Sequence, residues 1–395
     1  MAAGPPLRAQ QPVHPVTRAQ AVASALTRGA PAAFGRADTA AAAGVLRAAR
    51  LYPNPSVAAS YTKDVPHYHV LADLALDLPW LRAARVGAAA SARDAARYGF
   101  AFGRAAIRFD VDTTYTRALA ALAHARLSRR TASDADSLLR MAQLRREVGD
   151  ASELDVRLAE VNAGQLANIA ADDALAAVDA LLAVQLAMGL PAETPTVTLA
   201  DSLVPPVPPV PPTDSAPAPA GEALRVAAAA ASLRSLERAL TLAHRSVLPA
   251  PSLQAGFDQG DPTGPSGLLP MIGVSLSLPL FNRNGGEIAQ ATAARDRAQA
   301  NFDLVGRESA AERSRAERGF TAAMARLERN RRLLASADRV AAMSLQAYAE
   351  GAVPLANVLE AQRNAREALG RYIDDVAAAN DAAASLRLLT GADQP

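Results

Sequence analysis

Residues 268–291 change from one hydrophobic period to another within a single stretch. Apolar side chains occupy alternate positions from 272 to 280, with Gly, Ser and Pro between them. A period of two predicts a β-strand, here with one apolar face and one small, polar face. Such a strand could border a water-filled lumen on one side and an oily phase on the other. Residues 282–286 predict a turn, and an Ala-rich helical pattern follows.

The first half of the chain contains a similar alternation. Residues 56–62 and 70–78 each alternate larger apolar positions with smaller or polar ones, on either side of a polar turn. In the second half, residues 252–259 alternate in the same way, before a Gly- and Pro-rich loop at 260–267. The sequence therefore predicts two β-hairpins, at about 54–80 and about 251–281, with strands of about ten residues.

A long helical pattern without proline follows each predicted hairpin. The two patterns cover residues 81–148 and 286–350, which gives each helix a length of roughly 100 Å. Return helices at 152–188 and 353–390 can supply antiparallel partners over part of that length. In the last of these, apolar residues recur at spacings of three and four, which is typical of coiled-coil contacts.

The two halves follow one plan. Residues 51–57, with Pro53 and Pro55, match residues 247–253, and the segment Leu-Asp-Leu-Pro at 76–79 matches Leu-Ser-Leu-Pro at 276–279. We therefore predict a first structural repeat at 1–203 and a second at 220–395, each containing a helix, a hairpin, a long helix and a return helix. A Pro-rich linker at 204–219 joins them.

Composition excludes several classes of function. The net charge is +2, and Arg and acidic residues alternate along the same helices, which does not indicate nucleic-acid binding. Cysteine is absent, which excludes disulfides and thiolate metal sites. No nucleophile-elbow, phosphate-loop or HExxH motif occurs, so we expect neither an enzyme nor a cofactor. His67 and His69, with Asp64 nearby, are more typical of a surface hairpin than of a metal site.

The membrane signals point to strands rather than helices. No run of 18 or more apolar residues occurs, and the first twenty residues lack the apolar core of a signal peptide. If the protein is exported, its signal peptide is missing from this sequence, as a trimmed or misassigned start would explain. Strands of about ten residues can cross a bilayer when tilted, but four strands cannot close a barrel. Three chains would supply twelve.

Three features of the sequence resemble the TolC-like outer-membrane efflux proteins of Gram-negative tripartite efflux systems, and the resemblance covers nearly the whole chain. They are the Pro-x-Pro segments at Pro53 and Pro249, the strand-to-helix segment at 278–287, and residues 348–363, which are similar to the tip motif of the family. The segments Leu-Tyr-Pro-Asn-Pro and Pro-Leu-Phe-Asn-Arg-Asn look most like the heavy-metal efflux branch.

The resemblance implies a mainly α fold with membrane β-hairpins. Long antiparallel helices would form a trimeric α-barrel tunnel in the periplasm, and four strands per chain would contribute to a shared 12-stranded β-barrel in the outer membrane. The homotrimer would be a passive exit duct, gated at its periplasmic helical tip, for small molecules or metal ions. Its implied partners are a periplasmic adaptor, an inner-membrane pump of the RND type and outer-membrane lipid. A soluble elongated coiled-coil scaffold without channel activity is the alternative, although it leaves the strands without a role.

The resemblance also implies where the channel narrows. Glu360 and Asp155 match acidic residues that form rings at the periplasmic entrance in the family. Asn357 stands where the family carries another acid, so one ring would be uncharged. Three Glu360 carboxylates around a threefold axis would favour cations. Glu360 could instead be an ordinary exposed helix carboxylate, and an acid in the first turn of a helix, such as Asp155, is favourable in itself.

The predicted moving parts lie at the ends of the long helices. Gly149 and Gly351 are the predicted tip turns, which the resemblance places at the periplasmic entrance. Arg145, Arg146 and Glu147 could contact an adaptor or neighbouring chains, and a solvated helix end explains them as well. The predicted junctions between strands and helices contain Pro79, Trp80, Pro279, Phe281, Gly285 and Gly286.

Overall fold

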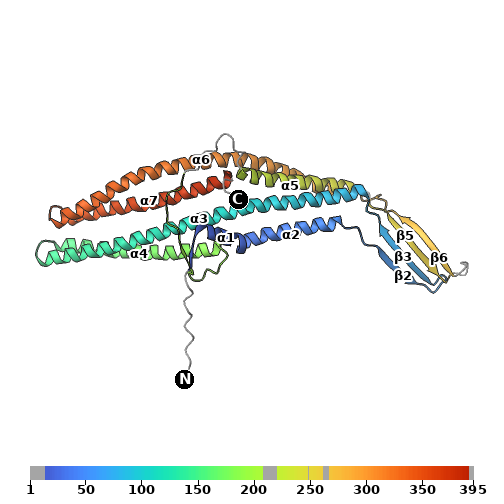
Figure 1. Ribbon diagram of the computed structural model, residues 1–395, viewed down its shortest axis with the longest axis horizontal. Coiled ribbons are helices and arrows are strands. Elements are labelled where there is room, and N and C mark those ends of the chain that lie inside the picture. Colours follow the sequence, from blue (N-terminus) through green and yellow to red (C-terminus); the bar gives the residue numbers. More distant parts are fainter. Residues whose placement is uncertain (1–13, 208–219, 248, 261–266, 391–395) are drawn as a thin grey trace, which may run out of the picture. The chain divides into compact units, whose positions relative to one another are not determined.

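A computed structural model describes residues 14–207, 220–247, 249–260 and 267–390 (Figure 1). Its elements, in chain order, are β1 (His14–Val16), α1 (Arg18–Arg28), α2 (Ala30–Arg50), β2 (Ser56–Tyr61), β3 (Tyr68–Ala75), α3 (Pro79–Glu147), α4 (Glu153–Ala187), β4 (Val197–Leu199), α5 (Ala220–Arg245), β5 (Ser252–Gln259), β6 (Leu268–Ser275), α6 (Gly285–Ala349) and α7 (Leu355–Thr390). The predicted mainly α fold with two β-hairpins is confirmed. Residues 208–219 of the predicted linker and 261–266 of the predicted loop lie outside the described residues.

The described residues form two compact units. Unit 1 draws on residues 1–33, 103–222 and 309–395, and unit 2 draws on residues 34–102 and 223–308, in each case as far as they are described. Each unit therefore combines segments from both halves of the chain. The two predicted repeats, 1–203 and 220–395, are consecutive halves of the sequence that follow the same plan. This division is a different one from the two compact units, and it stays a prediction.

Unit 2 contains a four-stranded antiparallel sheet in the order β2-β3-β5-β6 (Figure 1). Its register separates a mainly apolar face from a mixed face that holds most of the polar side chains and also Leu71, Leu269 and Met271, because alternate residues of paired strands point the same way. One face is apolar and includes Val57, Ala59, Val70, Ala72, Leu74, Leu253, Ala255, Phe257, Ile272 and Val274. The opposite face includes Ser56, Ser60, His69, Asp73, Ser252, Gln254, Asp258 and Ser275.

The strands are shorter than the sequence pattern predicts. They have six to eight residues, and β6 ends at Ser275, so the prediction of a strand continuing to Leu280 is wrong. Ser275 pairs with Ser252, the first residue of β5. Pro249 and Pro251 precede β5, and Pro279 follows β6, so that backbone donors for a longer ladder are missing. The alternation continues in the sequence after the ladder has ended.

The helix ends lie within two residues of their predicted positions. The first long helix begins at Pro79 instead of residue 81, because proline has no N–H to leave unpaired at the first position of a helix. The predicted return helices correspond to α4 and α7. Among the described residues, no helix is both long enough and apolar enough to cross a membrane.

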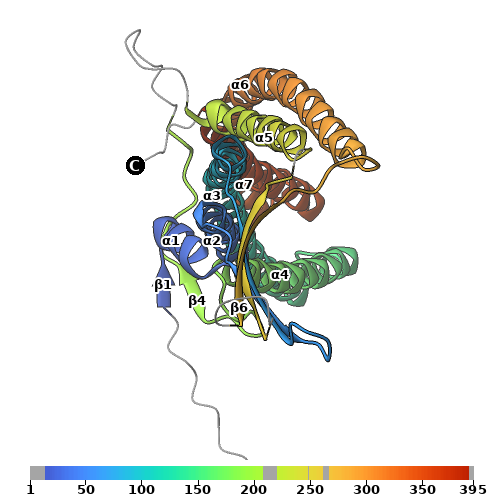
Figure 2. The same cartoon turned by 90° about the vertical axis from the view of Figure 1, so that its right-hand side faces the viewer.

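Unit 1 has its largest described apolar cluster where α1, α3 and α4 meet the short parallel strands β1 and β4, which lie beside each other in Figure 2. Tyr115, Val111 and Val184 are almost fully buried there. In unit 2, Leu46 and Ala49 of α2 pack on Ala89 of α3.

Candidate functional site

The two turns at the far ends of the long helices have the same backbone geometry. Gly149 and Gly351 have φ values of 88° and 76°, the left-handed region that favours glycine. After Gly149, the N–H of Asp150 donates to the carbonyl of Arg145 at 2.8 Å. After Gly351, the N–H of Ala352 donates to the carbonyl of Ala347, also at 2.8 Å. Both turns therefore close a helix end by the same hydrogen bond.

A buried cluster joins these two turns within unit 1. Tyr348, Leu355 and Val358 are at most 4% exposed and pack with Leu138, Ala142 and Val156. Arg145 donates from Nη1 to the carbonyl oxygen of Tyr348 at 2.6 Å, and its guanidinium lies 4.8 Å from the centre of the Tyr348 ring. Burial raises the pKa of Tyr348, and the Arg145 charge opposes that rise. The α3–α4 and α6–α7 helix pairs are thus fastened to each other beside the turns.

The predicted entrance residues lie near these turns in different environments. Asp155 is half-buried, and its Oδ2 accepts hydrogen bonds from the backbone N–H of Ser152 at 3.1 Å and from its hydroxyl at 2.9 Å. It therefore completes a capping box at the start of α4. Glu360 is exposed and forms an ion pair with Arg363 at 2.9 Å, while Asn357 is exposed. An entrance ring built from these residues stays a prediction.

Charged residues before the first turn have partners within the chain. Arg146 reaches across the turn to Glu153 at 3.4 Å, and Arg145 contacts Tyr348 as described above. Both arginines therefore form contacts within their own chain. Contacts of these residues with an adaptor or with a neighbouring chain stay predictions.

The strand–helix junctions meet at the end of α5. Arg245 donates from Nη1 to the carbonyl of Trp80 at 2.9 Å. Asn284, at φ 62°, donates from Nδ2 to the carbonyl of Ala243 and to Ser246 Oγ, both at 3.0 Å. Pro79 starts α3, Gly285 and Gly286 start α6, and Pro279 and Phe281 lie in the segment between β6 and α6.

Asp77 is a junction residue to which the sequence analysis assigned no role. Its side chain is 2% exposed and pairs with Arg85 at 2.8 Å and with Arg82 at 3.4 Å. Both arginines also donate to carbonyl oxygens at the end of α2, Arg82 to Arg50 and Arg85 to Ala49. The sequence did contain a signal for these ion pairs. An acid stands just before a helix, and two arginines three positions apart follow in the first turns of that helix.

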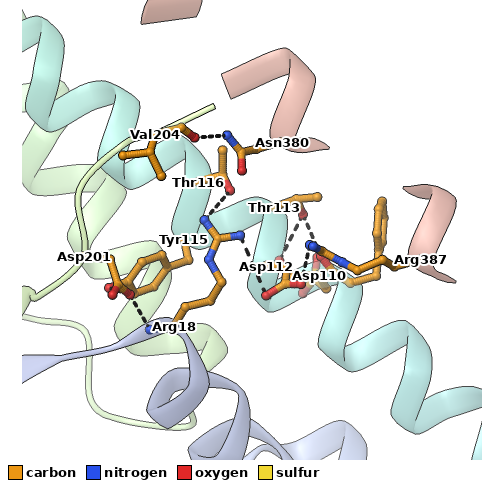
Figure 3. A network of polar contacts seen from close by, with 11 residues as sticks. Arg18, Asp110, Asp112, Thr113, Tyr115, Thr116, Asp201, Val204, Asn380 and Arg387 are labelled. Carbon is orange, nitrogen blue, oxygen red and sulfur yellow. Dashed lines mark hydrogen bonds and ion pairs between the residues drawn. The ribbon is translucent and has the colours of Figure 1, made fainter. Parts of the chain in front are cut away.

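A second polar network, in unit 1, was not expected from the sequence (Figure 3). The backbone N–H of Arg18 donates to Asp201 at 2.8 Å, and its side chain contacts Thr116 and Asp112 of α3. Arg387 of α7 pairs with the same Asp112 at 3.2 Å. Because its members lie far apart in the sequence, no local motif indicates the network. It ties α1 and α7 to one stretch of α3.

The polar face of the sheet contains paired side chains and no metal centre among the described residues. His69 Nδ1 lies 2.7 Å from Asp258 Oδ1, and Asp73 accepts hydrogen bonds from Ser252 at 2.6 Å and from Gln254 at 3.1 Å. Within the described part of the chain, no group of three or more His, Asp or Glu residues is placed to hold a metal ion.

The comparisons with known proteins agree with this architecture. Residues 221–392 match the family model described as outer membrane efflux protein. A search of the curated proteins finds no match.

Solved structures of outer-membrane channels share the fold over nearly the whole chain. VceC from Vibrio cholerae is 16% identical, with a TM-score of 0.75, and the match covers 95% of this chain and 96% of VceC. CusC is 17% identical, with a TM-score of 0.77 and coverage of 94% and 91%. The MtrE channel of Neisseria gonorrhoeae, solved in its open state, is 15% identical, with a TM-score of 0.76 and coverage of 95% and 88%.

The family match and the structural matches support each other. The family match lies in the second half of the chain, and the shared fold extends over the first half as well. At these identities the solved structures establish the fold alone. Residues 221–392 therefore match the outer membrane efflux protein family, and nearly the whole chain has the fold of solved channel proteins, which are not enzymes.

Proposed function

We propose that this chain is the outer-membrane exit duct of a tripartite efflux system and works as a homotrimer. The observation that carries the proposal is the sheet of unit 2. One of its faces is apolar, with Val57, Ile272 and Val274 highly exposed, and among the described residues β2 and β6 are edges without a further partner strand. Unpaired edges cannot lie in lipid, so neighbouring copies would pair them in a shared barrel of twelve strands.

The proposed duct lies in the outer membrane of a Gram-negative cell, with most of the chain in the periplasm. The apolar face of the sheet would contact lipid, and the face with Asp73, His69 and Gln254 would line the lumen. The long helices would continue the lumen as a periplasmic tunnel. In this proposal, transport through the duct is passive and is energised by the inner-membrane pump.

Gating is proposed at the tip formed by the Gly149 and Gly351 turns. Arg145 holds Tyr348 by a hydrogen bond and a ring contact, so opening requires these contacts to change or the two helix pairs to move together. A periplasmic adaptor that binds the turns would supply the free energy for that movement. Glu360, Asp155 and Asn357 would form the entrance, with Glu360 as the exposed acid and Asp155 partly engaged in its cap.

The proposed cargo is small molecules or metal ions, delivered by an inner-membrane pump of the RND type. The segments at 51–55 and 279–284 support the heavy-metal branch by resemblance alone. The neighbouring transporter gene would identify the pump and, through it, the substrate class.

Reconstitution of the purified full chain tests the proposal. We expect a detergent-extracted trimer that forms discrete ion-conducting channels in planar bilayers. A soluble elongated dimer without conductance would contradict the proposal and support the coiled-coil scaffold. Disulfide cross-linking between single cysteines placed on β2 and β6 provides a second readout, because a cysteine pair can bridge these strands only between copies.

A further inference from the structure

His69 is the second residue of β3 and lies on the polar face of the sheet, which the proposed duct turns toward the lumen. β3 begins after the turn that follows β2, and its other end leads into α3. His69 therefore lies at the end of the sheet that is remote from the helices. In the proposed duct the helices are periplasmic, so this end is the outer mouth of the barrel. The side chain of His69 is 35% exposed, so the solution in the lumen can reach it.

Both ring nitrogens of His69 have a polar partner. Nδ1 lies 2.7 Å from Oδ1 of Asp258, the residue opposite His69 on β5. Nε2 lies 3.3 Å from Oγ1 of Thr62, in the turn between β2 and β3. The same Oγ1 lies 2.9 Å from the carbonyl oxygen of Pro66 and 3.0 Å from that of Asp64. The imidazole therefore joins β5 to the turn.

This network has a hydrogen for every contact only if His69 is protonated. The Thr62 hydroxyl has a single hydrogen, and the two carbonyl oxygens beside it can only accept. The hydroxyl therefore donates to them, and its oxygen accepts from Nε2 of His69. The Asp258 carboxylate also accepts, and imidazole is the stronger base of the two groups, so Nδ1 carries a hydrogen as well. Only the imidazolium form has hydrogens on both ring nitrogens.

The surroundings of His69 make Asp258 the carboxylate that its charge meets. On β2 the residue opposite His69 is Ser60, which has no charge, and on β6 the residue opposite Asp258 is apolar. His67 Nδ1 lies 3.3 Å from the backbone oxygen of Thr62 and does not contact the His69 ring. The other titratable residues of the turn and its flanks are Lys63 and Asp64, with Tyr61 and Tyr68 on the apolar face.

We propose that His69 is a specificity-determining residue at the outer mouth of the duct. While His69 is protonated it neutralises Asp258, and when it loses the proton the Asp258 carboxylate remains as a net negative charge. The inference rests on the proposed trimeric channel, in which the pair occurs once in each chain. Histidine side chains change charge between about pH 5 and about pH 8. The mouth would therefore favour cations more strongly at the upper end of that range.

Reversal potentials of the reconstituted full chain across a KCl gradient test the proposal, at low ionic strength, where charges are least screened. We expect the cation-to-anion permeability ratio to rise between about pH 5.5 and about pH 8. His69→Gln is expected to abolish this rise and to hold the ratio at its high value, because Asp258 then stays unpaired. His67→Gln, in the neighbouring turn, is the matched control and is expected to keep the rise.

Asp258→Asn is expected to change the ratio in the opposite direction. The mouth then carries the positive charge of His69 at the lower pH and no charge from this pair at the higher pH. The ratio should therefore fall below that of the unmodified protein at both pH values. A purely structural role of the pair would not give opposite changes for His69→Gln and Asp258→Asn at the lower pH.

Nitrogen NMR of the histidine-labelled protein in lipid measures the protonation of His69 directly. Its signals are identified by their absence in His69→Gln. We expect two hydrogen-bearing ring nitrogens at about pH 5.5 and a single one at about pH 8. A His69 ring nitrogen without hydrogen at the lower pH would overturn the proposal.

Conductance separates a failure of this inference from a failure of the duct. Channels whose permeability ratio is the same in the unmodified protein, His69→Gln and Asp258→Asn would overturn the inference and leave the duct intact. A protein that conducts at neither pH would remove the duct, and the proposed role of His69 with it.

Discussion

Gln185 fastens the loop after α4 with one buried amide. Its Nε2 donates to the carbonyls of Pro191 and Thr194, and its Oε1 accepts from the N–H groups of Thr196 and Val197. We expect Gln185→Leu to lower the free energy of unfolding by about 3 to 5 kcal/mol, because four backbone groups lose their partner. Urea unfolding in detergent, followed by circular dichroism, measures the change. Gln165→Leu, on the exposed side of α4, is the control, with an expected change below about 0.5 kcal/mol.

Tyr115 links stability to alkaline pH. Burial and the hydrogen bond to Asp201 raise its pKa to about 12, compared with about 10 in an unfolded chain. The neutral phenol is therefore favoured in the fold, so its contribution is fully present below about pH 10 and is lost as the pH rises to about 12. We expect Tyr115→Phe to remove this part of the pH dependence of unfolding, and Tyr98→Phe, an exposed tyrosine, to leave it unchanged. If the free energy of unfolding changed with pH equally in both variants, Tyr115 would not be the source of this pH dependence.

Glu360 tests the proposed entrance. Its carboxylate is exposed, with Arg363 and the Asn364 amide of the next helical turn as partners, so it remains available to ions in an aperture. We expect Glu360→Gln to lower the cation preference and to weaken block by multivalent cations in single-channel recordings, because three negative charges leave a narrow ring. Glu367→Gln, a similarly exposed acid two turns further along α7, serves as the control. If cation preference and block were unchanged in Glu360→Gln, Glu360 would not line the aperture.

Among the elements, the turn between α3 and α4 depends on backbone conformation and not on packing. A side chain at Gly149 would have open space around it, yet φ is 88°. We expect Gly149→Ala to destabilise the protein by about 1 kcal/mol, the cost of a left-handed conformation for an L-residue. Gly164→Ala, at a helical glycine of α4 that also has open space, is expected to stabilise it by about 0.5 to 1 kcal/mol. Urea unfolding measures both changes. The expected result is a lower free energy of unfolding for Gly149→Ala and a higher one for Gly164→Ala.

For the whole molecule, the sheet distinguishes a membrane protein from a scaffold. Ile272 and Met271 are neighbours on β6 that lie on opposite faces, Ile272 on the apolar one. We expect Ile272→Arg to disfavour insertion into lipid vesicles by roughly 2 to 4 kcal/mol if the site is near the midplane. Met271→Arg should insert normally, because its side chain would face the lumen. Equal losses for both variants would show that the two faces do not meet different solvents.

Much of the fold could be predicted from the sequence because its signals are local. The period of two placed Val57 and Ile272 on an apolar face, and helical periodicity placed the ends of α4 and α7 within two residues. Two features of the site also had local signals that could have been interpreted further. Ser152 and Asp155 have the spacing of a capping box, and Asp77 precedes two arginines in the first turns of a helix.

The sequence by itself determined which segments are helix or strand and which face of each strand is apolar, because propensity and periodicity act between near neighbours. Only the tertiary structure decided where β6 stops, since a strand lasts as long as its partner offers backbone groups, and β5 begins at Ser252 after two prolines. It also decided that Arg145 holds Tyr348, 203 positions away, and that Arg18 and Arg387 share Asp112. Such contacts depend on how distant helices come together, and no local pattern records that.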